Sequence, residues 1–383
     1  MNTASKTGLV LTGGGARAAY QVGVVKAVSE LLGDRAENPF DVICGTSAGA
    51  VNAAALAINA DHFAAGVRKL LEVWENIHAD QVYRTDLVGT LRTGARWLGA
   101  LTLLYRNNPV SLLDNTPLRR LLESRLDFSR IQPNIDAGKL YAVGITASGY
   151  ASGQSVTFYQ GGPDIEAWAR TQRTGAARPL DADIVLASSA LPFLFPAVKV
   201  HREYFGDGSM RQIAPISPAL HLGADRVFII GTGRQNPRPP RVRSNSYPSL
   251  AQIAGHALNS IFLDTLSVDL ERLQRINRTL RCVKPECARE SGLTLRHIDV
   301  LFISPSQSIE RIAARHVRAL PATTRFLLRA IGAMNRNGAN LASYLLFEAD
   351  FCRALIDLGY RDTLARAAEV QTFFKAERPV ALA

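Results

Sequence analysis

Five residues near the start of the chain fit the pattern G-x-S-x-G, in which a serine lies on a sharp turn between a strand and a helix. They are Gly45, Thr46, Ser47, Ala48 and Gly49. The two glycines permit the turn, and the positive end of the following helix would lie beside the serine oxygen. The same residues also fit a helix that merely begins with a capping serine. Because a strand is expected before Ser47 and a helix after it, we interpret Ser47 as a nucleophile.

A nucleophilic serine needs a base, and an ordinary α/β-hydrolase supplies Ser, Asp or Glu, and His in that order, well into the chain. Ser47 comes too early for this arrangement, and the later histidines lie in helical or strand-like patterns without a catalytic turn. Asp207 is the alternative, since it ends an apolar run and has a glycine on each side, one of them Gly208. An aspartate at such a place also fits a structural Asx-turn. We expect Asp207 to act as the general base.

Three consecutive glycines, Gly13, Gly14 and Gly15, follow the first apolar run. Their N–H groups can converge on an anion, which predicts an oxyanion hole. Arg17 either anchors this loop or is a solvated helix residue. The glycines also fit the dinucleotide-binding fingerprint G-x-G-x-x-G/A, but the acidic residue expected at the end of the second strand is replaced by the Ser47 turn. The phosphate-binding pattern G-x-x-x-x-G-K-S/T is absent.

Alternating strands and helices must position these residues. Apolar runs and helical spacing predict two strand–turn–helix units, over residues 8–12 and 16–32 and over 40–44 and 48–58. Repeated units of this kind imply a parallel sheet covered by helices, with ligands at the carboxyl ends of the strands. Further strands are expected at residues 140–146, 198–205, 226–231 and 297–303, and helices at 250–280 and over most of 306–375.

The composition is that of a globular protein, with 47% apolar and 20% charged residues among 383. The net charge of +11 favours anionic partners such as membrane lipid or nucleic acid, although a basic surface also simply aids solubility. The chain has four cysteines, begins without the long apolar segment of a signal peptide and contains no run that could span a membrane. We therefore expect a protein kept in the cytoplasm, where thiols stay reduced.

Together, Gly13-Gly14-Gly15-Ala16-Arg17, Gly45-Thr46-Ser47-Ala48-Gly49 and Asp207-Gly208-Ser209 resemble the ordered motifs of the patatin-like phospholipases. The run from Ala187 to Pro192, leading to Phe195-Pro196, is similar to the segment before the aspartate in that family. The resemblance implies a three-layer α/β/α fold with a mostly parallel sheet and a Ser47–Asp207 dyad that uses no histidine. It also implies hydrolysis of phospholipids or other acyl-lipid esters, without a metal or cofactor.

The resemblance predicts a catalytic core over residues 1–235 with an insertion at about 85–133. An exposed linker would follow at 236–249, and a mostly helical extension over 250–383 would return a strand to the core near 297–303. Two residues depart from the family pattern: Ala18 replaces the glycine after the arginine, and Ser209 replaces the second glycine after the aspartate. We expect altered packing of both loops and an intact dyad.

Residues 91–105 combine apolar and aromatic residues, among them Trp97, Leu101 and Tyr105, with arginines at both ends. This pattern fits a helix lying in a bilayer interface, and equally a buried insertion or lid helix. The expected partners are an acyl-lipid substrate and the anionic inner face of the membrane, and no nucleic acid. Two alternatives stay open: a thioesterase or acyltransferase with the same dyad, and a catalytically weak lipid-binding protein.

Overall fold

The computed structural model describes residues 5–33, 37–85, 111–234, 249–283, 295–330, 332–333 and 339–375. Its centre is a mixed sheet in the order β10-β9-β1-β2-β3-β4-β6-β5. The first five strands in this order are parallel to one another. They are β10 (Asp299–Ile303), β9 (Arg226–Ile230), β1 (Thr7–Leu11), β2 (Val42–Thr46) and β3 (Ala142–Gly149). The parallel order brings the carboxyl ends of β1 and β2 to one edge, where the Gly13 loop and Ser47 follow them.

Strands of mixed direction extend the sheet beyond β3. Strand β4 (Ser155–Gly161) pairs with β3, and β6 (Arg173–Ala177) and β5 (Ala169–Arg170) follow. The strand expected over residues 198–205 is instead two strands, β7 (Val198–Val200) and β8 (Glu203–Asp207), which form a hairpin. The chain reverses at His201, whose φ is 57°. The hairpin sets β8 antiparallel to β3, with Asp207 opposite Ala147.

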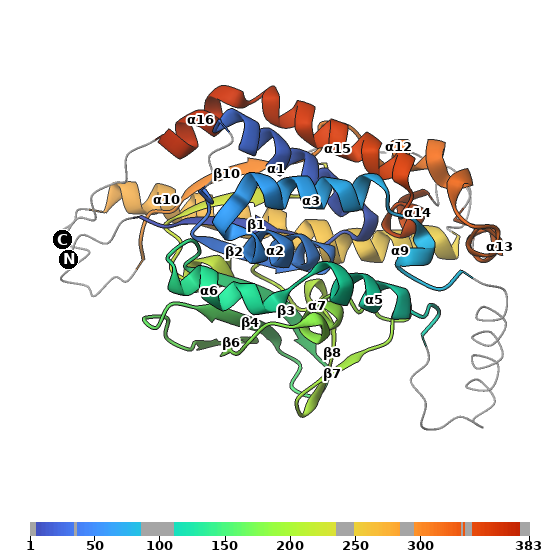
Figure 1. The fold of residues 1–383 in the computed structure, drawn as a ribbon, viewed down its shortest axis with the longest axis horizontal. Helices are drawn as coiled ribbons and strands as arrows, with labels where there is room; N and C mark the ends of the chain where they lie inside the picture. Colours follow the sequence, from blue (N-terminus) through green and yellow to red (C-terminus); the bar gives the residue numbers. More distant parts are fainter. Residues whose placement is uncertain are drawn as a thin grey trace.

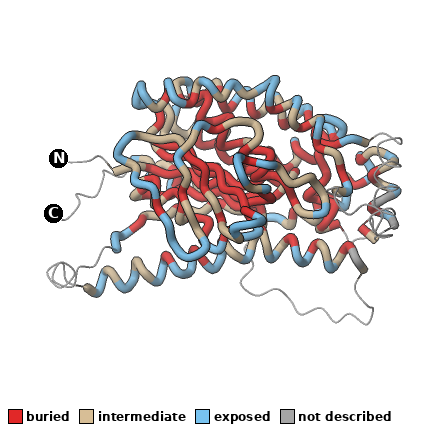
Figure 2. The backbone as a smooth tube through the Cα atoms, turned by 90° about the horizontal axis from the view of Figure 1, so that it is seen from below, coloured by how far each residue is buried: buried red, intermediate tan, exposed pale blue. Residues whose placement is uncertain are grey.

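Helices cover both faces of the sheet, as Figures 1 and 2 show. Side chains alternate along the strands, so Leu9 and Leu11 of β1 face one core and Val10 faces the other. The first core includes α1 (Ala19–Leu31), α2 (Ala48–Ile58), α3 (Phe63–Glu75) and α7 (Ala182–Ser188). The second includes α8 (Ser217–His221) and α10 (Thr265–Cys282). The fold is therefore the three-layer α/β/α arrangement predicted from the sequence.

The C-terminal helices pack directly on the N-terminal ones. Helices α15 (Ala349–Leu364) and α16 (Ala367–Lys375) lie along α1 (Figure 1), and α12 (Ile309–His316) and α14 (Ala339–Leu345) contact α15 or the loop before α1. The remaining helices are α5 (Thr116–Arg125), α6 (Ile131–Asp136), α9 (Leu250–Asn259) and α13 (Ala322–Ala330). None of the helices described combines the length and apolar character needed to cross a bilayer.

Candidate active site

Ser47 lies at the turn between β2 and α2, with φ 56° and ψ −130°. A non-glycine residue adopts this conformation only under strain, which is the backbone geometry of a nucleophile elbow. Close packing explains the flanking glycines: a side chain at Gly49 would collide with the carbonyl oxygen of Leu11. The Ser47 side chain makes no capping hydrogen bond to α2. The elbow therefore has the local geometry expected of a nucleophile and lacks the side-chain contact of a structural cap.

The Ala187–Pro192 run ties the elbow and the aspartate to β3. The backbone N–H of Ser47 donates to Ser188 Oγ at 2.9 Å, and the Ser188 hydroxyl donates to the carbonyl of Thr146 at 2.6 Å. The N–H of Asp207 donates to the carbonyl of Ala190 at 2.9 Å. One short run thus fixes the backbone of both Ser47 and Asp207. The sequence did not predict that the Ser188 hydroxyl links the Ser47 backbone to β3. The resemblance of the Ala187–Pro192 run to the family was the one signal that this segment lies near the site.

Asp207 is buried, with 1% of its surface exposed. Its Oδ1 accepts a hydrogen bond from the N–H of Ser209 at 2.9 Å. Burial raises the pKa of Asp207 from 3.8 to about 6, against the hydrogen bonds from Ser47 and Ser209, which lower it. Oδ2 accepts no hydrogen bond of ordinary geometry from the described residues, so the Ser47 contact is a loose one in this state. Hydrogen bonds between catalytic groups are often loose until substrate binds.

The glycine loop follows β1 and leads into a short 3₁₀ helix, Gly15–Ala18. The carbonyl of Gly13 accepts a hydrogen bond from Thr232 Oγ1 at 2.6 Å, and that of Gly14 accepts one from the N–H of Arg17 at 3.1 Å. The N–H groups of Gly14 and Gly15 donate to no other described residue. The loop therefore has its carbonyls occupied and two amide donors available for an anion. Gly15 lines the same apolar pocket as Ser47.

Arg17 is fully buried, and its guanidinium contacts the C-terminal helices. Its Nε donates to Ser343 Oγ at 2.8 Å and its Nη2 to Asn340 Oδ1 at 2.5 Å, both on α14. Nη2 also lies 3.1 Å from a carboxylate oxygen of Glu310 on α12. The guanidinium stacks 4.1 Å from the ring centre of Tyr344. These contacts attach the glycine loop to residues more than 290 positions later, which no local pattern could have predicted.

The pocket beside Ser47 has a volume of about 70 Å³ and an almost wholly apolar wall. Its residues come from α2, α3, α5, the Ala187–Pro192 run and the C-terminal region. Among them are Val51, Trp74, Leu121, Leu191, Phe195, Phe262, Tyr344 and Phe347. Trp74 and Phe347 stack with their ring centres 6.2 Å apart. A narrow apolar pocket that begins at the Ser47 elbow is suited to a hydrocarbon chain and unsuited to a charged group.

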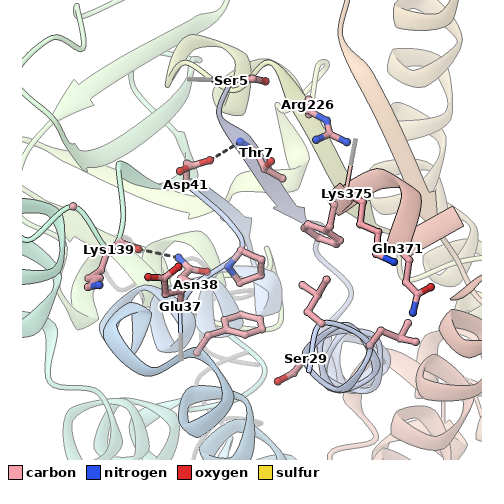
Figure 3. A pocket seen from close by; sticks show the side chains of 16 residues that line it. Ser5, Thr7, Ser29, Glu37, Asn38, Asp41, Lys139, Arg226, Gln371 and Lys375 are labelled. Atoms are coloured by element: carbon pink, nitrogen blue, oxygen red, sulfur yellow. Dashed lines mark hydrogen bonds between the residues drawn. The ribbon is translucent and has the colours of Figure 1, made fainter. Parts of the chain in front are cut away.

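A larger cavity of about 450 Å³ lies at the opposite ends of the strands (Figure 3). Thr7 at the start of β1, Asp41 before β2 and Arg226 at the start of β9 line it. It contains none of the predicted catalytic residues. Ligands of parallel α/β sheets bind at the carboxyl ends of the strands. We therefore place the candidate active site at the smaller apolar pocket.

Three other predicted site residues, Trp97, Leu101 and Tyr105, lie outside the described residues, as does most of the predicted linker. The structure brings the remaining predicted residues together. A side chain at Gly13 would collide with Ser209, which contacts Asp207, and a side chain at Gly208 would collide with the carbonyl of Thr146. The three motifs thus meet at one edge of the sheet.

Comparison with known proteins identifies the family. The family model for patatin-like phospholipases matches residues 9–220, more than half of the chain. The chain belongs to the patatin-like phospholipase family. The matched range contains the glycine loop, the Ser47 elbow and Asp207, whereas α9 to α16 lie beyond it.

Three individual proteins that are similar to this patatin-like protein share little sequence with it. A curated Escherichia coli protein, named cUMP-AMP-activated phospholipase, is 27% identical over 121 residues, which cover 27% of this chain and 38% of the relative. Two solved structures are similar at low identity. VipD from Legionella pneumophila has 14% identity and a TM-score of 0.30, with 92% of this chain and 67% of that chain covered. Human GIVD cytosolic phospholipase A2 has 12% identity and a TM-score of 0.38, with 97% and 59% covered.

Proposed function

We propose that this protein is a lipid acyl hydrolase of the phospholipase A type, which cleaves fatty acyl esters with Ser47 as nucleophile and Asp207 as general base. One observation carries the proposal: the strained Ser47 lies beside a buried aspartate of raised pKa, at an apolar pocket shared with Gly15. We further propose a cytoplasmic location with contact to the anionic inner face of the membrane.

The proposed reaction has two halves. Ser47 Oγ attacks the acyl carbonyl carbon while its proton passes to Asp207, and the amides of Gly14 and Gly15 hold the negative oxygen. The tetrahedral intermediate collapses, the ester C–O bond breaks, and the leaving alcohol takes the proton from Asp207. Water then attacks the acyl-serine, again losing a proton to Asp207, and the fatty acid departs as Ser47 regains a proton. Each donor to the oxyanion contributes about 2.7–4 kcal/mol in comparable enzymes.

Arg17 has a positioning role in this proposal. Since its side chain is buried among α12 and α14, it fixes the glycine loop and does not touch the substrate. The acyl chain would enter the pocket between α2 and the C-terminal region, with Trp74 and Phe347 at its wall. Tyr344 also lines this pocket, and its backbone carbonyl lies so close to Gly15 that no side chain would fit there. Tyr344 therefore holds the wall of the pocket against the glycine loop.

A fluorophosphonate probe tests the nucleophile, because it reacts with activated serines. The wild type should be labelled and Ser47→Ala should not, while Ser189→Ala, a neighbouring pocket serine, serves as the control. Mass spectrometry of membranes incubated with the two proteins should show free fatty acid and lysolipid only with the wild type. Equal labelling of both proteins would disprove the assignment. Preferential consumption of acyl-CoA, or acyl transfer to an acceptor other than water, would favour the thioesterase or acyltransferase alternative.

A further inference from the structure

Phe193 is a large apolar side chain held in an unfavourable place. It is 74% exposed, and its φ of 66° lies in the left-handed region that phenylalanine rarely adopts. Exposure leaves its ring in water, and the backbone conformation adds strain. A residue with both disadvantages contributes nothing evident to the stability of the fold, which indicates a role in contact with another molecule.

The residues on either side of Phe193 belong to the active-site pocket. Leu191 and Phe195 both line the cavity that contains Ser47, and Leu194 packs against the core. The left-handed backbone at Phe193 turns its ring outward while its neighbours point inward. The exposed ring therefore lies on a segment that also forms the wall of the proposed acyl pocket.

Leu112 extends this apolar surface. The N–H of Leu112 donates to the carbonyl of Phe193 at 2.8 Å, and the N–H of the next residue donates to the carbonyl of Leu194 at 2.8 Å. Leu112 is 41% exposed. Residues 112–113 lead into α5, whose Leu118 and Leu121 line the pocket. We call Leu112 and Phe193 the apolar tip. It is attached on both of its sides to elements that form the pocket.

We propose that the apolar tip inserts into the interface of an anionic phospholipid bilayer and thereby brings the pocket to its substrate. The proposal rests on the proposed lipid substrate, since a lipid ester must leave the bilayer to reach the buried Ser47. Two exposed apolar side chains beside an apolar pocket suit the boundary between head groups and acyl chains.

Charge favours an anionic surface. The chain carries a net charge of +11, and the segment that holds Phe193 continues into the β7–β8 hairpin, where Lys199 and Arg202 are exposed. Lysine and arginine near an anionic membrane add attraction that salt weakens. Vesicles with anionic lipid should therefore bind the protein more strongly than neutral vesicles do.

Phe193→Asp tests the tip, because aspartate tolerates the left-handed conformation better than phenylalanine and the fold should be retained. The full-length protein is sedimented with vesicles of phosphatidylcholine alone or mixed with phosphatidylglycerol. Phe326→Asp is the matched control: Phe326 is also 74% exposed, and it lies on α13 and does not line the pocket. Both substitutions change the net charge equally.

We expect Phe193→Asp to lose at least about tenfold in binding to mixed vesicles and in hydrolysis of their lipid. Its turnover of a water-soluble p-nitrophenyl ester should match that of the wild type, its melting temperature should be no lower, and Phe326→Asp should bind normally. Unchanged vesicle binding by Phe193→Asp would overturn the proposal. So would a change in its oligomeric mass by light scattering, which would identify a protein–protein surface. Failure of the wild type to hydrolyse any ester would refute the proposed function and leave the binding result intact.

Discussion

Asp207 is a buried carboxyl group whose ionised form the protein disfavours. Its pKa of about 6 lies above the unfolded value of 3.8, so the folded state binds the proton more tightly than the unfolded state does. Stability is therefore lost as pH rises between these two values, and the loss is complete above pH 6. The difference corresponds to about 3 kcal/mol.

Asp207→Asn should remove the free-energy cost of burying an ionised carboxylate, and it should also remove the proposed general base. We expect the free energy of unfolding of the variant to exceed that of the wild type by up to about 3 kcal/mol at pH 8, and the difference to vanish below pH 4. Wild-type kcat/KM should rise with pH to a plateau above pH 6, because the base acts in its ionised form. Urea unfolding at several pH values and a pH–rate profile check both effects. A variant that is less stable at pH 8 would contradict the proposed desolvation of Asp207.

Ser209 stands where the family pattern has glycine, and it lowers the pKa of Asp207 through both its N–H and its hydroxyl. The sequence difference therefore has an electrostatic consequence. Ser209→Gly keeps the backbone donor and removes the hydroxyl, so the pKa of Asp207 should rise. We expect the acidic limb of the kcat/KM profile to move to higher pH. An identical profile in Ser209→Gly, or a shift to lower pH, would show that the hydroxyl does not stabilise the carboxylate.

At the scale of elements, the link between the glycine loop and α14 depends on the forked geometry of Arg17. Lysine keeps the charge but cannot reproduce the separate bonds to Ser343 and Asn340. We expect Arg17→Lys to reduce kcat for a soluble ester at least about tenfold with little change in KM, because oxyanion contacts act in the transition state. Arg361→Lys on the exposed side of α15 is the control. A rise in KM alone would mean that the loop positions substrate instead.

Elements with strong local patterns were predicted well from the sequence. The helix expected at 48–58 matches α2, since an alanine-rich segment after the Ser47 turn leaves little ambiguity. The hairpin of β7 and β8 was missed because the apolar residues before and after His201, Arg202 and Glu203 were read as one strand, whereas the chain turns at the left-handed His201. Strands β4 and β6 were not anticipated. The partners of Arg17 on α12 and α14 depend on tertiary packing alone.

At the scale of the whole molecule, the C-terminal helices are packed on α1 without space for side chains at two glycines. A side chain at Gly23 would collide with the carbonyl of Ile356, and one at Gly359 with the carbonyl of Tyr20. A larger side chain at either glycine would therefore push α15 away from α1. Since α14 directly precedes α15 and also holds Arg17, the packing of α15 on α1 should control the glycine loop.

Gly359→Ala tests this connection. Alanine alone would favour the helix by about 1 kcal/mol, so a net loss of stability would report the collision with α1. We expect a loss of about 1–3 kcal/mol, with slower fluorophosphonate labelling of Ser47 well below the melting temperature. Asp357→Ala, on the exposed face of the same helix, should change neither. Normal labelling in a destabilised Gly359→Ala would show that the catalytic edge of the sheet is independent of the C-terminal helices, because the loop would keep its geometry after α15 had shifted.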